Sequence, residues 1–308
     1  MSIAVNLDGV IYPPEQARIS VFDRQFLYGD GLYETMRTYE GKLFALPAHL
    51  QRLRHGAAQI AMPVPWTDAQ LRMELEKVME AAGNPESVLR MMITRGEGEF
   101  GLDPASAQQP RLVIIARPFN PLSPETRAAG IEVVVPRVRR NSPSALPGSV
   151  KSGNYLNQVL ALAEGRSRGA FEVILLDDLG HVTEGSTSNV FWVKEGVLFT
   201  PSLRLCVLPG ITRALVLKLA QRLGIPTRVG LFQGDALRAA DEAFISSSLK
   251  ELLPITRCDG VAVGSGLPGP LSQQLQAAFE AEASTGAEEV LDPDWLDEAA
   301  HELAEVSA

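Results

Sequence analysis

The sequence predicts a mixed α/β protein with two domains. Its 308 residues are enough for about two domains of roughly 150 residues each. Hydrophobic residues make up 45% and charged residues 21% of the chain, which is typical of a globular protein and excludes a disordered or fibrous one. Segments with strand-like and helix-like patterns alternate along the chain, and this alternation predicts the mixed class.

Two helices are predicted in the N-terminal part. The first covers residues 47–60, where apolar residues recur at helical spacing and Pro47 suits a first turn. The second begins at Thr67, which has the capping-box spacing with Gln70. Two short apolar runs then predict buried strands at 89–94 and 112–116. The apolar stripe of the second helix consists of Leu71, Leu75, Val78 and Ala82.

A proline-rich stretch at residues 118–130 is predicted to be a surface linker between the domains. The predicted organisation is therefore a small N-terminal domain of residues 1–117, an interdomain linker of 118–130, a larger C-terminal domain of 131–279 and an acidic C-terminal extension of 280–308. In the larger domain, strands are predicted at 131–135, 173–176 and 190–193. Helices are predicted at 154–168, with an apolar face of Leu156, Val159, Leu160 and Ala163, and at 212–223.

The C-terminal extension has a composition of its own. It contains ten acidic residues and no Lys or Arg. Apolar residues recur in it at helical spacing, which predicts an acidic amphipathic helix packed on the body of the protein. A solvated tail is the alternative. The apolar positions are Trp295, Leu296, Ala299, Ala300, Leu303 and Val306.

Charge and cysteine content restrict the partners. The balance of 28 basic and 37 acidic residues gives 28 − 37 = −9, which argues against binding to nucleic acid or to an acidic membrane surface. No apolar run approaches the roughly 18 residues of a membrane helix, and the N-terminus lacks the pattern of a signal peptide. Cys206 and Cys258 form no disulfide framework, so a reducing, cytoplasmic setting is expected. The histidines lack metal-ligand spacing, and no metal site is predicted.

Three short segments contain residues that could take part in catalysis or ligand binding. Lys151 lies just before a predicted helix, Glu184 lies in a tight turn-like stretch before the strand NVFWV, and Gly210, Ile211 and Thr212 open an amphipathic helix. A helix start offers backbone N–H groups to a phosphate. Taken singly, the three segments are better explained as a surface lysine, a solvated turn acid and an ordinary helix cap.

Together and in order, however, seven motifs make the chain similar to the fold-type IV pyridoxal-phosphate (PLP) enzymes. This group contains branched-chain aminotransferases, D-amino-acid aminotransferases and aminodeoxychorismate lyases. The resemblance runs from about residue 5 to about residue 279 and implies a small N-terminal α/β domain with a larger pseudo-barrel domain. The motifs are VFDRQFLYGDGLYETMR, AHLQRL, TRGEGEFGLDP, KSGNYLNQ, VTEGSTSNVF, LPGITR and DEAFISSSLKEL.

The resemblance assigns cofactor roles residue by residue. Lys151 matches the lysine that holds the cofactor aldehyde and shuttles the proton, and Glu184 matches the carboxylate partner of the pyridine nitrogen. Arg52 matches the arginine that clamps the phosphate, since a planar fork suits a dianion. The remaining cofactor positions are Ile211 and Thr212 at the helix start, the hydroxyl residue Ser248, and Tyr155 near the ring.

The substrate residues are predicted partly from the resemblance and partly from strand geometry. Tyr33, Thr35 and Arg37 alternate along a strand and should share one face. Phe100 and Leu102 stand where D-amino-acid enzymes carry an Arg and a His, so the loop resembles that of branched-chain enzymes. Thr35 differs from the branched-chain pattern, which has glycine there, and matches a threonine of the lyases.

These assignments predict a PLP-dependent aminotransferase, with a hydrophobic L-amino acid as donor and 2-oxoglutarate as acceptor. The alternatives within the fold are an aminodeoxychorismate lyase and a D-amino-acid or amine transaminase. A non-catalytic cofactor-binding protein is the alternative outside enzymes. The resemblance also implies a homodimer, with the loops around Tyr28 and around residues 100–102 reaching the neighbour's site.

Overall fold

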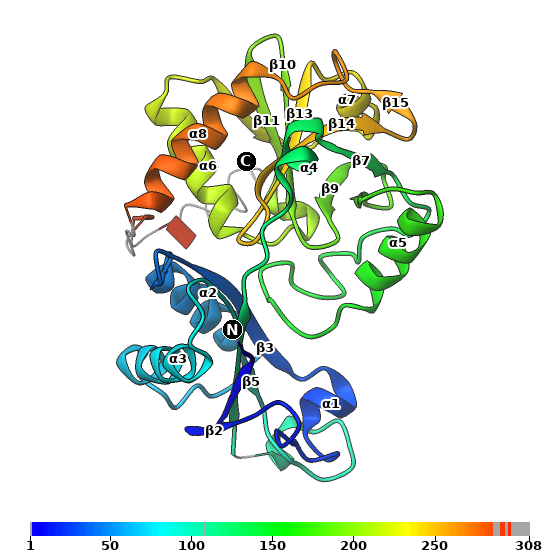
Figure 1. Ribbon diagram of the computed structural model, residues 1–308. Helices are drawn as coiled ribbons and strands as arrows, with labels where there is room; N and C mark the ends of the chain where they lie inside the picture. Colours follow the sequence, from blue (N-terminus) through cyan, green and yellow to red (C-terminus); the bar gives the residue numbers. More distant parts are fainter. Residues whose placement is uncertain (1, 108, 286–289, 293–294, 297–308) are drawn as a thin grey trace. The chain divides into compact units, whose positions relative to one another are not determined.

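The computed structural model describes residues 2–107, 109–285, 290–292 and 295–296, and the chain divides into two units (Figure 1). The first unit comprises the chain up to Asn120 together with Val150–Asn154. The second comprises Pro121–Ser149 and the chain from Tyr155 to Thr285. The short segment Val150–Asn154 groups with the first unit, where a β-bridge joins Ser152 to Leu32, whereas the sequence analysis placed it in the C-terminal domain.

The first unit is built on a six-stranded antiparallel sheet with the order β2-β1-β6-β5-β3-β4. The strands predicted at 89–94 and 112–116 are β5 and β6, neighbours near its centre. The sheet consists of β1 (Ala4–Leu7), β2 (Val10–Tyr12), β3 (Gly31–Tyr39), β4 (Lys42–Leu43), β5 (Ser87–Thr94) and β6 (Arg111–Pro118).

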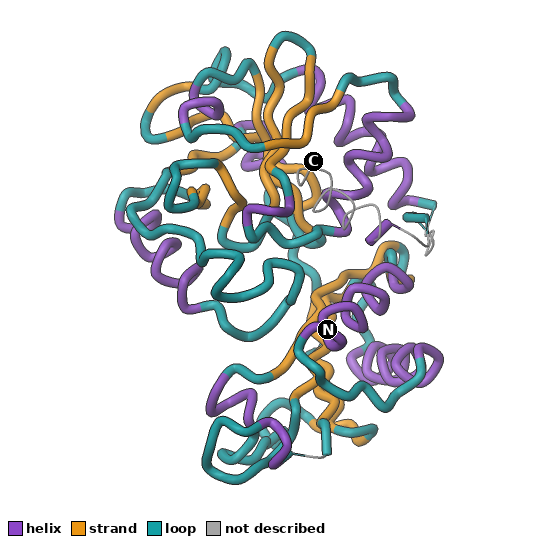
Figure 2. Tube along the Cα trace, turned by 180° about the vertical axis from the view of Figure 1, so that it is seen from behind, coloured by secondary structure: helices purple, strands orange, loops and turns teal. Residues whose placement is uncertain are grey.

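Two helices cover one side of this sheet, as Figure 2 shows, and the sequence predicted both. They are α2 (Leu46–Gln59) and α3 (Asp68–Ala82). The predicted capping box is confirmed, because Gln70 N–H donates to the Thr67 hydroxyl at 3.2 Å and Thr67 N–H donates to the Gln70 side chain at 2.7 Å. The apolar stripe of α3 is buried in the core. Since burying one leucine contributes roughly 1.5–3 kcal/mol, this stripe fixes α3 on the sheet. The unit also contains α1 (Arg24–Tyr28) and the 3₁₀ turn Pro104–Ser106.

The second unit contains a nine-stranded sheet of mixed direction. Eight strands follow the order β12-β11-β10-β13-β14-β7-β8-β9, and β15 pairs with β14. The sheet curls, because β9 at one end of the order also contacts β10 and β11, and this confirms the predicted pseudo-barrel. Its strands are β7 (Ile131–Val134), β8 (Glu172–Leu176), β9 (Val182–Gly185), β10 (Asn189–Lys194), β11 (Val197–Pro201), β12 (Thr227–Gly230), β13 (Glu242–Ser247), β14 (Glu251–Cys258) and β15 (Val261–Ala262).

Helices flank the sheet of the second unit. α6 (Ile211–Arg222) buries Leu215, Val216 and Leu219, as its periodicity predicts. α5 (Leu156–Ser167) instead packs through Gln158, Ala161 and Gly165 and leaves its predicted apolar face exposed. The others are α7 (Asp235–Arg238), α8 (Pro270–Ser284) and the 3₁₀ turn Leu203–Leu205. Within the described residues, no helix combines the length and hydrophobicity needed to cross a bilayer.

The stretch predicted as a surface linker contains a short helix, α4 (Pro124–Ala129). Its ends explain the difference. Ser123 caps the helix by accepting the Thr126 N–H at 3.2 Å, Pro124 occupies the first turn, and Gly130 ends it with φ of 70°. The three prolines of this stretch therefore include one that begins a helix rather than preventing it.

Only part of the predicted acidic extension lies within the described residues. There Val290, Trp295 and Leu296 are buried, and Lys218 of α6 forms an ion pair with Asp292. The remaining positions of the predicted amphipathic helix, from residue 297 onward, lie outside the described residues.

Candidate active site

Lys151 lies beside strand β3 of the first unit. Its carbonyl accepts the N–H of Tyr33 at 3.0 Å, and its ammonium lies 4.6 Å from the centroid of the Tyr33 ring. The preceding Val150 packs against the hydrophobic core. The lysine is half-buried, so its amine is held at a defined place on the sheet rather than extended into solvent.

The two faces of β3 have different roles. Tyr33, Thr35 and Arg37 share one face, as the alternation predicts, while Leu32 and Met36 on the other face belong to the core beneath α2. Arg37 is buried, and its guanidinium lies 3.9 Å from the ring centroid of Tyr39 and 3.5 Å from that of Phe119. These contacts fix a cation on the same face as Tyr33, against which Lys151 lies.

Arg90 is a residue of this face that the sequence analysis missed. It pairs with Thr35 in the register of β3 and β5, and its guanidinium stacks 3.8 Å from the Tyr33 ring centroid. Arg90 is exposed. A single charged residue within the apolar run SVLRMMIT was the available signal, but the register that sets it opposite Thr35 depends on tertiary pairing.

Arg52 lies on α2 and is held by a buried carboxylate. Its Nε and Nη2 donate to Glu34 at 2.9 and 2.6 Å, and His49 Nδ1 lies 2.7 Å from the same carboxylate. Burial acts to raise the pKa of Glu34, but the charge of Arg52 and the hydrogen bonds of both partners outweigh it and lower the pKa to about 2. For His49, by contrast, burial lowers the pKa, because it disfavours the charged imidazolium. Glu34 is therefore an anion that compensates and orients the predicted phosphate arginine.

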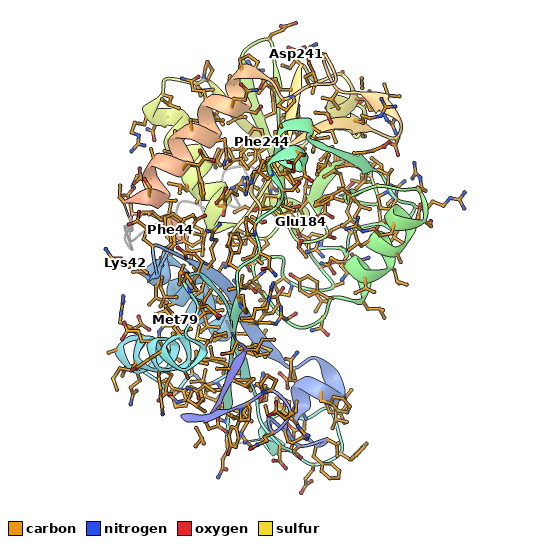
Figure 3. The ribbon with its side chains drawn as sticks, viewed as in Figure 1. Lys42, Phe44, Met79, Glu184, Asp241 and Phe244 are labelled. Carbon is orange, nitrogen blue, oxygen red and sulfur yellow. The ribbon has the colours of Figure 1, made fainter. Side chains whose placement is uncertain are left out.

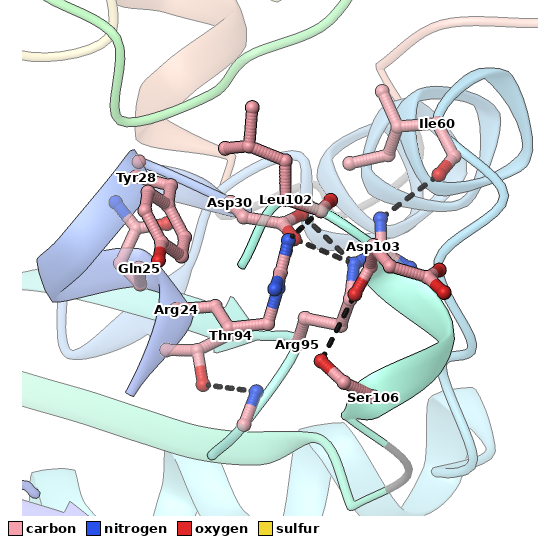
Figure 4. Close-up of polar contacts among 12 residues, drawn as sticks. Arg24, Gln25, Tyr28, Asp30, Ile60, Thr94, Arg95, Leu102, Asp103 and Ser106 are labelled. Carbon is pink, nitrogen blue, oxygen red and sulfur yellow. Dashed lines mark hydrogen bonds and ion pairs between the residues drawn. The ribbon is translucent and has the colours of Figure 1, made fainter. Parts of the chain in front are cut away.

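The loop that carries Phe100 and Leu102 is anchored from below (Figure 4). The buried Arg24 donates to the carbonyls of Gly101 at 2.8 Å and Leu102 at 3.1 Å, and it pairs with Asp30 at 2.8 Å. Arg95 pairs with the same Asp30 at 2.8 Å and donates to two carbonyls at the end of α2. The side chains of Phe100 and Leu102 are each 78% exposed. The first unit alone therefore does not bury the predicted apolar wall.

In the second unit, the carboxylate of Glu184 is held at both oxygens. Glu184 stands on β9, at the position labelled in Figure 3. Its Oε1 lies 2.8 Å from Arg140 Nη2, and its Oε2 accepts the N–H of Leu208 at 3.0 Å. The residue is 7% exposed. The residue that the resemblance assigns to the pyridine nitrogen is thus an almost buried carboxylate with a fixed orientation.

The start of α6 lies two residues after Leu208. Gly210 is the N-cap, and a Cβ there would lie 1.9 Å from Asn189 Oδ1, so a larger residue would have to displace the Asn189 amide. The first-turn N–H groups of a helix have no partner within the helix, and they favour an anion. Ile211 and Thr212, which the sequence analysis assigned to the phosphate, are the first residues of this turn, and both are buried.

The hydroxyl residues of β13 lie beside this region. Ser246 pairs with Asn189 across β10 and β13, and its buried Oγ has no hydrogen-bond partner among the described residues. Ser248, the predicted hydroxyl residue, follows in the turn after β13 and is half-buried. Tyr155, also half-buried, stands at the N-cap of α5. The second unit therefore holds five of the predicted cofactor residues, and the first unit holds Lys151 and Arg52.

These features together define a class of PLP enzymes: a small antiparallel unit, a curled mixed sheet, a fixed lysine, hydrogen-bond donors suited to a phosphate, and a carboxylate suited to accept from a ring nitrogen. The family model described as "Amino-transferase class IV" matches residues 31–258. A putative branched-chain-amino-acid aminotransferase of Methanocaldococcus jannaschii is 36% identical over 276 residues, which cover 90% of this chain and 95% of that protein. The chain therefore belongs to the class IV aminotransferases.

Solved structures agree with this family. The branched-chain amino acid aminotransferase of Escherichia coli matches with a TM-score of 0.89 at 32% identity, covering 94% of this chain and 97% of that chain. The branched-chain aminotransferase of the thermophilic archaeon Thermoproteus uzoniensis, solved with norvaline, matches with a TM-score of 0.86 at 32% identity, covering 94% and 98%. Another branched-chain enzyme, solved with pyridoxamine 5'-phosphate, has a TM-score of 0.88 at 28% identity, covering 93% and 96%. The fold-type IV architecture predicted from the motifs is thus confirmed.

Relatives with other reactions match at similar identity. A D-alanine aminotransferase of Listeria monocytogenes is 35% identical over 288 residues, covering 90% of this chain and 95% of that protein. A 4-amino-4-deoxychorismate lyase of Pseudomonas aeruginosa matches with a TM-score of 0.80 at 33% identity, covering 91% and 99%. Identity alone therefore defines the family and leaves the substrate to be argued from the site.

Proposed function

We propose that this protein uses PLP to transfer the amino group of a branched-chain, hydrophobic L-amino acid to 2-oxoglutarate. The observation that carries the proposal is the placement of the Lys151 amine against Tyr33, on the face of the sheet that also presents Arg37 of β3 and Arg90 of β5. An amine nucleophile beside an aromatic wall and two cations suits an amino acid and a dicarboxylate acceptor.

The donor set of both units fits PLP. Lys151 provides the amine for the aldehyde, and Arg52, the α6 start and Ser248 provide donors for the phosphate. The buried hydroxyl of Ser246, which has no hydrogen-bond partner in the described part of the chain, adds a polar atom on the strand that leads to Ser248. Tyr155 is assigned to the ring and Glu184 to its nitrogen. When bound, PLP supplies a ring that accepts negative charge from the substrate Cα.

The protein's own residues would then hold and move one proton. The Lys151 amine, once released by the incoming substrate, acts as the general base and acid at the substrate Cα. Glu184 would hold a proton on the ring nitrogen, because Arg140 and the Leu208 N–H fix its carboxylate and favour its charged form. Arg52 holds the phosphate while Glu34 fixes the orientation of its guanidinium.

We derive the choice of substrate from the side chains on the face of β3 that carries Tyr33, Thr35 and Arg37. Arg37 is assigned to one carboxylate, and Arg90 to the second carboxylate of 2-oxoglutarate, which the sequence analysis left without a partner. Tyr33 offers an apolar surface for a branched side chain, whose burial is worth roughly 1.5–3 kcal/mol. Thr35 narrows this face relative to glycine, and it is half-buried between Tyr33 and Arg37.

The proposal includes a homodimer, supported by exposed apolar side chains in each unit. In the first unit Val21, Phe22 and Phe26 are exposed, and Phe22 contacts Phe100 with a ring-centroid distance of 6.2 Å. The Tyr28 hydroxyl accepts the N–H of Gly101 at 3.2 Å, which joins the two predicted loops. A second copy of the chain would bury these side chains and place Phe100 and Leu102 in a substrate wall.

The alternative favoured by a specific observation is aminodeoxychorismate lyase activity. Thr35 lies on the same face of β3 as Tyr33, where a lyase would use its hydroxyl. The Thr35→Gly variant separates the two functions. It should improve turnover of bulky donors if Thr35 only narrows the site, and it should abolish pyruvate release from aminodeoxychorismate if the hydroxyl is catalytic.

The main test is a donor panel with the PLP-loaded protein and 2-oxoglutarate as acceptor. We expect L-leucine, L-isoleucine and L-valine to be good donors and D-alanine a poor one, by at least about tenfold. Borohydride reduction of the loaded protein should attach the cofactor to Lys151, as located by mass spectrometry, and Lys151→Ala should lose turnover. A preference for D-amino acids, or pyruvate release without transamination of L-leucine, would contradict the proposed reaction.

A further inference from the structure

Arg140 joins three parts of the second unit. It lies on the segment that follows β7, and its backbone N–H donates to the carbonyl of Leu176 at the end of β8, at 2.9 Å. The side chain is only 9% exposed. Its Nη2 lies 2.8 Å from Glu184 Oε1, and its Nε donates to the carbonyl of Cys206 at 3.1 Å. No motif in the sequence points to a role for this arginine.

The loop that contains Cys206 leads directly to α6. Leu208 N–H donates to the other oxygen of Glu184, and the Leu208 carbonyl accepts from Asn189 Nδ2 at 3.0 Å. Gly148 packs so closely on this loop that a Cβ would lie 2.5 Å from the carbonyl carbon of Cys206. The segment around Arg140 and the loop 206–208 therefore form one closely packed piece with Glu184.

We propose that Arg140 is a positioning residue of the active site, which orients Glu184 toward the ring nitrogen of PLP and keeps its carboxylate ionised. The inference rests on the proposed function. A guanidinium at hydrogen-bond distance favours the charged carboxylate over the protonated one, so the shared proton stays on the ring nitrogen. The ring then keeps its capacity to accept charge from the substrate Cα.

The planar guanidinium of Arg140 also links the residue assigned to the ring nitrogen of PLP with the loop that precedes the residues assigned to its phosphate. One donor group contacts Glu184, assigned to the ring nitrogen, and another contacts Cys206, on the loop that leads to the phosphate residues Ile211 and Thr212. A lysine carries the same charge but lacks this rigid fork. The charge and the geometry of Arg140 can therefore be tested separately.

The experiment is a double-mutant cycle on the PLP-loaded protein. The variants are Arg140→Met, Arg140→Lys, Glu184→Gln and Arg140→Met with Glu184→Gln. Arg139→Met is the matched control, because Arg139 is exposed and adjacent in sequence. Two quantities are measured for each: the rate of the half-reaction with a large excess of L-leucine, followed by cofactor absorbance, and the dissociation constant of PLP from fluorescence titration of the cofactor-free protein.

We expect Arg140→Met to slow the half-reaction by about 10- to 100-fold, by analogy with the loss of the hydrogen-bond partners that orient metal ligands. In the Glu184→Gln background the same change should have less than about a threefold effect, because the partner is already neutral. Arg140→Lys should retain more of the half-reaction rate than Arg140→Met but bind PLP more weakly than wild type. Arg139→Met should match wild type in both measurements.

Equal losses from Arg140→Met in both backgrounds, or a wild-type half-reaction rate in that variant, would overturn the inference. If Arg140→Met does not fold, Arg140→Lys takes its place in the same cycle with Glu184→Gln. A purely structural role would lower stability in both backgrounds alike and would not produce the coupling. If wild-type protein reacts with no amino acid at all, the proposed function fails instead, independently of Arg140.

Discussion

At the scale of single residues, the charged side chains assigned to cofactor and substrate already have partners in the protein. Arg52 is paired with the buried Glu34, and Arg37 is stacked between two aromatic rings. Pre-organisation of this kind lowers the entropy that would otherwise be lost when a ligand binds. It also makes these arginines depend on residues that never contact the ligand.

Glu34 gives the first prediction at this scale. Glu34→Gln should destabilise the protein by about 3–5 kcal/mol at neutral pH, because it leaves the buried Arg52 without its counter-charge. The pKa of Glu34 is lowered from 4.5 to about 2. The stabilisation is therefore fully present above pH 4.5 and is lost as the pH falls toward 2. Chemical denaturation of both proteins across this range measures the difference.

The exposed Glu80 provides the control, since Glu80→Gln removes a carboxylate from the solvent side of α3. It should change the unfolding free energy by less than about 0.5 kcal/mol. A wild-type advantage over Glu34→Gln that stays constant down to pH 2 would show that ionisation of Glu34 is not the source of the stability.

The sequence predicted the residues of the candidate site better than their partners. Lys151, Glu184 and Thr212 stand in local motifs, so their chemistry was visible in one stretch of chain. Glu34 and Arg140 were not identified, because Glu34 meets Arg52 only when α2 packs on β3, and Arg140 meets Glu184 only when the segment after β7 packs beside β8 and β9. A sequence pattern contains spacing along the chain, whereas these pairs depend on tertiary packing.

At the scale of elements, local signals predicted the helices that cover the sheets. They did not always predict which face of a helix packs against its sheet. The capping box and stripe of α3 lie within one segment and were predicted correctly. The apolar face of α5 is real, yet in this chain it points away from the sheet. Periodicity shows that a helix has two faces, and only the surroundings decide which one is covered.

The loop of Phe100 and Leu102 gives a prediction at this scale. Arg24→Lys should loosen residues 98–103, because lysine cannot supply the three directed donors that hold Asp30, Gly101 and Leu102. We expect amide hydrogen exchange in this loop to accelerate by at least about tenfold, and the unfolding free energy to fall by roughly 1–3 kcal/mol. Mass spectrometry of exchanged peptides measures the first effect.

Arg18→Met is the control for Arg24→Lys, since Arg18 is an exposed arginine that lies shortly before Arg24 in the chain. It should leave exchange unchanged. Donor selectivity is an independent readout, because a loosened loop should reduce the preference for L-leucine over L-alanine while PLP binding stays the same. Unchanged exchange at residues 98–103 in Arg24→Lys would mean that the loop is held by its own turn around Asp103 rather than by the arginine.

At the scale of the whole molecule, exposed apolar surface supports the proposed assembly. Leu156, Val159 and Leu160 are 70%, 58% and 53% exposed on one face of α5. Single exposed apolar residues are ordinary, but several on one helix face mark an interaction surface. The first unit exposes a second group that includes Phe22, Phe26 and Phe100. A homodimer would remove both groups from water.

We therefore expect the wild-type protein to be a dimer at micromolar concentration, and Val159→Lys with Leu160→Lys to shift it toward monomers by at least about tenfold in dissociation constant. Burying two lysine charges in an apolar interface costs far more than the roughly 1.4 kcal/mol of a tenfold change. Met73→Lys is the control, because Met73 is 64% exposed on α3, outside both groups. Sedimentation velocity measures the masses.

If the double variant remains a dimer while Phe26→Lys gives a monomer, the first unit carries the interface and the α5 face lies outside it. A monomeric wild-type protein that still transaminates L-leucine would instead show that Phe100 and Leu102 need no second copy, and that the substrate wall is built within one chain.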